Sequence, residues 1–146
     1  IVAYVDSSAI VKLVADEDES EALRDWVEAD VTCLTSRVTT VEVPRALRRK
    51  GRVGLERAAR PLDEALRSIA LLELDGLTAE QAATTGSPAL RSLDAIHLAS
   101  ALTIASELDA FVTYDLRLAD AAREAGLAVV APAYGPASTI VSPPNT

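Results

Sequence analysis

Short runs of consecutive apolar residues alternate along this chain with longer segments that have helical character. Strands that are apolar at successive positions are covered on both faces, and alternating strands and helices form a parallel sheet with helices packed against it. The sequence therefore predicts an α/β fold with a central, mainly parallel sheet and helices on both faces. The predicted strands cover residues 1–5, 31–34, 69–74, 110–112 and 127–131.

The predicted helices cover residues 8–14, 20–29, 36–50, 53–68, 78–85, 92–108 and 116–125. Gly51 and Gly126 follow two of them, as expected of residues that end a helix. Pro44 lies within the third, so this helix either begins near Val43, with the proline in its first turn, or is kinked there. Residues 132–146 are rich in proline and small residues, which predicts an extended, mobile tail after a single domain of residues 1–131.

The composition is that of a folded protein in a reducing compartment. Hydrophobic residues make up 49% of the 146 residues and charged residues 25%, which is enough for a stable core. Cys33 is the only cysteine, so no intrachain disulfide can form. The apolar start is too short for a signal-peptide core or a membrane span. We therefore expect a soluble, cytoplasmic protein with no membrane partner.

The net charge of −8 argues against binding nucleic acid through bulk attraction to phosphate. The charge is unevenly distributed, however. Residues 16–30 are strongly acidic. Residues 45–60, in contrast, contain six arginines and one lysine but a single acid. A local basic surface is therefore predicted on an acidic protein.

Four acidic residues fall where predicted strands end or just inside the helices that follow: Asp6, Glu42, Asp94 and Asp115. Because ligands of open parallel sheets bind outside the carboxyl ends of the strands, we expect the fold to gather these side chains at one edge. Four carboxylates in one pocket repel each other unless a cation is present. Oxygen-rich acidic sites select hard divalent ions, chiefly Mg²⁺ or Mn²⁺.

Each acid also has a structural interpretation. Asp6 and Asp115 precede predicted helices and suit N-caps, Asp94 can complement a helix dipole, and Glu42 can be a solvated helix residue. His97, the only histidine, lies one turn after Asp94 on an apolar helix, where a hydrogen-bonded core residue is the expected role. The coincidence of all four acids at one edge favours a shared site.

A site of this kind suits phosphodiester hydrolysis. A divalent ion polarises phosphoryl oxygens and lowers the pKa of an attacking water, so that no protein nucleophile is needed. The sequence contains no serine elbow, no Cys–His pair and no glycine-rich phosphate loop.

Four segments, in this order, resemble the acidic signatures of the VapC-type PIN-domain toxin ribonucleases of type II toxin–antitoxin systems. They are residues 4–13 with the Asp6-Ser7-Ser8 opening, residues 40–43 around Glu42, residues 91–99 with the Asp94-Ala-Ile-His97-Leu-Ala block, and residues 112–119 with the Thr113-Tyr-Asp115 close. The resemblance covers residues 1–131 and implies a PIN-like three-layer sandwich.

The resemblance implies an endoribonuclease that uses Mg²⁺, or Mn²⁺ in its place, to hydrolyse RNA with a metal-activated water. It also implies a toxin that is inhibited by a cognate VapB-type antitoxin and forms a homodimer. The implied site roles are metal ligation by Asp6, Asp94 and Asp115, completion of the catalytic acidic set by Glu42, and hydroxyl support from Ser7 and Thr113.

In that setting the basic stretch would hold RNA phosphates, because arginine forks match phosphate oxygens. Its members are Arg45, Arg48, Arg49, Lys50 and Arg52. A solvated helix face would have the same pattern. Aromatic residues form only 3% of the chain, too few for a base-stacking platform, so RNA shape and groove contacts would set any preference.

Two other functions fit parts of the pattern. A catalytically silent PIN-like module would bind an antitoxin or RNA, although the retention of four mutually repelling acids argues against it. A phosphoacceptor receiver domain also places aspartates at strand ends. It needs an acidic pair after the first strand and a lysine after the last, where this chain has Asp6-Ser7 and Ala131-Pro132.

Overall fold

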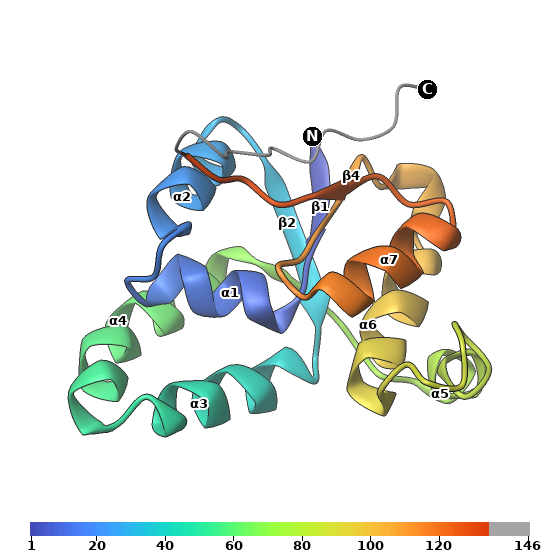
Figure 1. Cartoon of the computed structure of the whole chain (residues 1–146), viewed down its shortest axis with the longest axis horizontal. Helices are drawn as coiled ribbons and strands as arrows, with labels where there is room; N and C mark the ends of the chain where they lie inside the picture. The colour runs from blue at the N-terminus through green and yellow to red at the C-terminus, as the bar shows by residue number, and fades with distance from the viewer. Residues whose placement is uncertain (135–146) are drawn as a thin grey trace.

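The computed structural model describes residues 1–134, in which one parallel sheet lies between two layers of helices (Figure 1). The strands are β1 (Val2–Val5), β2 (Thr32–Ser36), β3 (Ala70–Leu72), β4 (Ala110–Val112) and β5 (Val129–Val130). Their order in the sheet is β3-β2-β1-β4-β5, and every neighbouring pair is parallel. The predicted fold class is therefore confirmed.

Two groups of helices cover the two faces of the sheet. The helices of the described residues are α1 (Ser7–Val14), α2 (Ser20–Glu28), α3 (Thr39–Arg49), α4 (Arg52–Ser68), α5 (Gly76–Ala82), α6 (Ser92–Leu102) and α7 (Leu116–Glu124). Helices α1 to α4 contact one another on one side, and α6 contacts both α5 and α7 on the other (Figure 1).

The central strand β1 shows why both faces are covered. Ala3 and Val5 pack into the core beneath α1, α3 and α4, whereas Tyr4, between them, packs against Phe111 and the residues of α6 and α7. All three side chains are fully buried. Successive apolar residues in this strand thus serve two separate hydrophobic cores, as expected for a strand buried on both sides.

Three predicted helices differ from the structure. The helix predicted over 78–85 is α5 (Gly76–Ala82), which Asp75 caps. The helix predicted over 92–108 ends at Leu102, where the hydroxyl of Thr103 donates to the carbonyl of Ser100, and a short 3₁₀ turn, Ala105–Glu107, leads into β4. The helix that contains Pro44 begins at Thr39, so the interpretation that started it near Val43 is wrong. Pro44 lies inside α3, where it cannot donate a backbone hydrogen bond.

The end of the predicted tail cannot be compared with the structure, because residues 135–146 lie outside the described residues. Just before them, the Tyr114 hydroxyl donates to the carbonyl of Pro132 at 2.7 Å, and Tyr134 donates to Asp25 at 2.8 Å. Among the described residues, no helix combines the length and the apolar character that a membrane crossing requires.

Candidate active site

The two central strands deliver two acids to the same edge of the sheet. Asp6 follows β1 directly and caps α1, and Asp115 caps α7 just after β4. Because β1 and β4 are parallel neighbours with Val5 beside Val112, both acids lie at the carboxyl edge of the sheet. The N-cap interpretation of each is thus correct, and it is compatible with a position in a shared site.

Asp6 is held by three hydrogen bonds in a buried setting. Its Oδ1 accepts from the Ser8 hydroxyl at 2.7 Å and from the Ala9 backbone N–H at 2.9 Å, and its Oδ2 accepts from the Thr113 hydroxyl at 2.5 Å. Only 2% of the residue is exposed. Burial raises the pKa of Asp6, although these hydrogen bonds, and the positive charge of nearby His97 when that ring is protonated, oppose the shift. The carboxylate is therefore fixed in position but costly to keep ionised.

Glu42 reaches the same edge from α3. Its Oε1 lies 2.6 Å from His97 Nε2, and its Oε2 accepts from the Ser7 hydroxyl at 3.2 Å. The side chain is 18% exposed, while that of His97 is 1% exposed. His97 is therefore the hydrogen-bonded core residue that the sequence predicts, and one of its partners is a candidate site residue.

Asp94, in the first turn of α6, lies near the other ionisable groups of the site. Burial raises its pKa most, and the negative charges of Asp115, Asp6 and Glu42 raise it further, while the positive charge that His97 carries when protonated lowers it. Asp94 therefore lies close enough to the other three predicted acids for their charges to act on it. Asp115 caps α7 through Oδ1, which accepts from the backbone N–H groups of Arg117 and Leu118. Its Oδ2 takes no part in these two capping hydrogen bonds.

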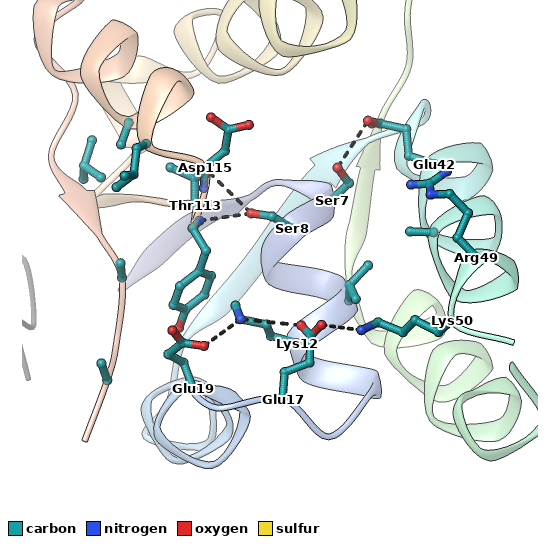
Figure 2. A pocket seen from close by; sticks show the side chains of 18 of the residues that line it. Ser7, Ser8, Lys12, Glu17, Glu19, Glu42, Arg49, Lys50, Thr113 and Asp115 are labelled. Carbon is teal, nitrogen blue, oxygen red and sulfur yellow. Dashed lines mark hydrogen bonds and ion pairs between the residues drawn. The ribbon is translucent and has the colours of Figure 1, made fainter. Parts of the chain in front are cut away.

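A pocket of about 790 Å³ opens beside these residues (Figure 2). Glu42, Ser7, Thr113 and Asp115 lie at one end of it. Asp6 and Asp94 do not line the pocket; Asp6 lies beneath the hydroxyls of Ser8 and Thr113. The pocket thus meets only part of the acidic set.

Charged side chains at the other end of the pocket neutralise one another. Glu17 accepts from Lys50 at 2.5 Å and lies 3.5 Å from Lys12, which also pairs with Glu19 at 2.6 Å (Figure 2). The Lys12 ammonium lies 4.9 Å from the centre of the Tyr114 ring. This network joins the α1–α2 connection to the end of α3, and it gives the far end of the pocket no large excess of either charge.

The predicted basic stretch divides into two groups. Arg49 and Lys50 line the pocket, and Figure 2 shows Arg49 on the same wall as Glu42. The other three residues are exposed but do not line it: Arg45, Arg48 and Arg52. Arg123 of α7 also lines the pocket and pairs with Asp120 at 3.3 Å.

Sequence reasoning missed Ser8 and Arg123 as site residues. The Ser8 hydroxyl donates to Asp6 and accepts from the backbone N–H of Tyr114 at 3.0 Å, so it links α1 to the segment after β4. Its place in Asp6-Ser7-Ser8 was a usable signal. Arg123 had no such signal in the sequence, because only the folded chain brings α7 and α3 to the same pocket.

The donor chemistry of the acidic edge fits a hard divalent cation. Its polar side chains present carboxylate and hydroxyl oxygens, and a cation would relieve the repulsion that raises the pKa of Asp94. Within residues 1–134, no group of three or more His, Cys, Asp or Glu side chains is arranged as a ready metal site.

Sequence comparisons match almost the whole described chain. The profile of the PIN domain matches residues 3–124. Ribonuclease VapC35 of Mycobacterium tuberculosis is 44% identical over 133 residues, which cover 88% of this chain and 96% of that protein. Ribonuclease VapC47 of the same species is 42% identical over 134 residues, with the same coverage.

Solved structures support the fold. VapC20 of M. tuberculosis, a toxin that cleaves the sarcin-ricin loop, has a TM-score of 0.66 at 17% identity and covers 86% of this chain and 95% of its own. VapBC2 from Rickettsia felis, solved with a promoter DNA fragment, has a TM-score of 0.65 at 13% identity and covers 90% and 99%.

The raised pKa of Asp94 predicts how stability depends on pH. Because the folded state binds the proton more tightly than the unfolded state, the free energy of unfolding falls as pH rises from the ordinary pKa of 3.8 to the raised value, and stays lower above it. The Asp94→Asn side chain cannot ionise, so the variant does not undergo this loss of unfolding free energy. We expect the variant to be more stable than the wild type at pH 7 in metal-free buffer, with the difference shrinking toward pH 4.

Urea unfolding with EDTA at both pH values measures the effect. Asp63→Asn is the matched control, because Asp63 is an exposed acid of α4 that pairs with Arg67. An Asp94→Asn variant no more stable than the wild type at pH 7 would contradict the assigned repulsion.

Proposed function

Because the chain belongs to the PIN-domain family and, within it, to the VapC ribonucleases, we propose that it is a metal-dependent endoribonuclease and the toxin of a toxin–antitoxin pair. The observation that carries the proposal is that three other carboxylates, those of Asp6, Glu42 and Asp115, lie around Asp94 at the carboxyl edge of the sheet. The proposed reaction is hydrolysis of RNA phosphodiester bonds, and the proposed setting is the cytoplasm.

The proposed cofactor is Mg²⁺, with Mn²⁺ as a substitute, held by Asp6, Asp94 and Asp115. Such an ion supplies a Lewis acid for the phosphoryl oxygens and lowers the pKa of the attacking water. The chain's own contribution is to hold the carboxylates in place before substrate arrives. Ser8, Thr113 and the Ala9 N–H fix Asp6, and Ser7 fixes Oε2 of Glu42.

We propose that the pocket holds the RNA backbone beside the acids. Arg49, Lys50 and Arg123, which line the pocket, would contact phosphates inside it, whereas Arg45, Arg48 and Arg52 would contact RNA that extends beyond the pocket. Glu17 and Glu19 neutralise the lysines at the far end. Close phosphate contact there would have to displace these pairs, so Arg49 is the residue best placed to bind without that cost.

The proposed protein partner is an antitoxin of the VapB kind, and a homodimer is proposed on the same family grounds. Structural neighbours include a toxin–antitoxin complex from Klebsiella pneumoniae, with a TM-score of 0.57 at 22% identity. Three site acids have an exposed apolar chain neighbour: Val41 beside Glu42, Leu93 beside Asp94, and Leu116 beside Asp115. A partner could cover these residues and insert an arginine or lysine among the carboxylates.

The second candidate is a silent PIN-like module that binds RNA or an antitoxin without cleaving. The buried Asp6, with its raised pKa, argues against it, because an ionised carboxylate is expensive to retain in a site that holds no cation.

Asp94→Asn should abolish cleavage while leaving the fold intact. Losing several kcal/mol of transition-state stabilisation corresponds to a rate at least about a hundredfold lower. The measurement is the initial rate of cleavage of a mixed RNA pool with Mg²⁺ and with EDTA, alongside thermal melting. Asp63→Asn should cleave normally. Normal Mg²⁺-dependent cleavage by Asp94→Asn would refute the site, and a wild type that binds RNA without cleaving it would support the silent module.

Arg49→Ala should weaken RNA binding across many sequences. Each lost phosphate contact lowers the slope of log K against log salt by about one unit or slightly less. Binding is measured by fluorescence anisotropy in EDTA at several salt concentrations. Arg60→Ala, on an exposed part of α4 away from the pocket, is the control and should leave the slope unchanged. Equal slopes for the wild type and Arg49→Ala would remove Arg49 from the RNA path.

A further inference from the structure

A buried chain of hydrogen bonds leads from the centre of the sheet to the site. The Tyr4 hydroxyl lies 2.7 Å from His97 Nδ1, and His97 Nε2 lies 2.6 Å from Glu42 Oε1. The three residues come from β1, α6 and α3, so the chain connects elements on both sides of the sheet. Tyr4 and His97 are almost completely buried.

The order of donors along this chain follows from its two ends. A carboxylate oxygen of Glu42 accepts, so His97 Nε2 carries the proton that is donated to it. The neutral ring then has a lone pair on Nδ1, and Tyr4 must donate to it. Burial raises the pKa of the Tyr4 phenol, which keeps this donor protonated. Tyr4 itself is fixed by stacking on Phe111, with ring centres 5.3 Å apart and planes 4° from parallel.

Glu42 needs such a restraint more than the other acids do. Asp6 and Asp115 are short side chains fixed by backbone N–H groups at helix starts, whereas Glu42 has a longer side chain and no cap. Its negative charge also contributes to the repulsion at Asp94, which favours moving it outward into solvent. Ser7 and His97 oppose that movement, and His97 provides the shorter of the two bonds.

We propose that His97 is a positioning residue that holds Glu42 in the acidic site, and that Tyr4 supports it by donating to Nδ1, which fixes the imidazole with its Nε2–H directed at Glu42. The catalytic consequence rests on the proposed nuclease function, whereas the tautomer and its hydrogen bond from Tyr4 do not. A core histidine that only filled space would need neither bond, and an apolar side chain of similar volume would replace it without effect on the site.

Nitrogen-15 NMR of the imidazole tests the tautomer directly. His97 is the only histidine in the sequence, so an untagged protein gives one pair of ring signals. We expect the neutral Nε2–H tautomer in the wild type at pH 7 in EDTA, and a downfield shift of the unprotonated Nδ1 signal in Tyr4→Phe, because that lone pair loses its hydrogen bond. A wild-type ring in the Nδ1–H or doubly protonated form, or an Nδ1 signal unchanged in a folded Tyr4→Phe variant, would overturn the proposal.

Kinetics test the positioning role. His97→Leu should lower kcat for RNA cleavage by about tenfold to a hundredfold, the range expected when a site group is misplaced, with KM within about twofold of the wild type. His97→Gln, which can still donate an N–H to Glu42, should recover most of the loss. Thermal melting identifies unfolded variants, and His97→Gln keeps the test usable if His97→Leu does not fold.

A folded His97→Leu variant with unchanged kcat would overturn the positioning role, as would an equal loss in a folded His97→Gln variant. A wild type without nuclease activity would instead refute the proposed function, while the NMR result would still decide the tautomer. The two failures are therefore distinguishable.

Discussion

The hydrogen bonds of the buried Asp6 carboxylate hold together the two central segments of the site. Burying a carboxylate is unfavourable unless donors replace water, and here the donors come from α1 and from the segment that follows β4. Thr113, which donates to Asp6, also accepts from the backbone of Asp115, and Ser8 accepts from Tyr114. The pairing of β1 with β4 and the placement of two acids are thus parts of one arrangement.

The acidic and basic features of the chain have separate places in this arrangement. The carboxyl edge concentrates negative charge, while at the far end of the pocket Glu17 and Glu19 pair with Lys12 and Lys50. A net charge of −8 is therefore compatible with an RNA substrate if phosphate contacts are local and a cation accompanies the acids. The same distribution would suit a cationic inhibitor.

The strands and the edge position of the acids could be predicted because they depend on local pattern: apolar runs mark strands, and parallel strands end at a common edge. Helix ends were harder to predict, because the end of α6 depends on the hydrogen bond of the Thr103 hydroxyl and on the turn that leads into β4. The side-chain partners could not be predicted, because His97 and Glu42 are separated by 55 positions and meet only through packing. The same holds for Arg123, which lines the same pocket as Arg49 only in the folded chain.

The central claim is that Asp6, Asp94 and Asp115 hold a divalent ion at the carboxyl edge of the sheet. Anomalous diffraction from crystals grown with Mn²⁺ tests it most directly, because it locates the ion without relying on activity. The account predicts an anomalous peak within coordination distance of carboxylate oxygens of these three residues, and its loss in Asp94→Asn crystals grown in the same way. A peak elsewhere, or one that persists at the same position in Asp94→Asn, would contradict the claim.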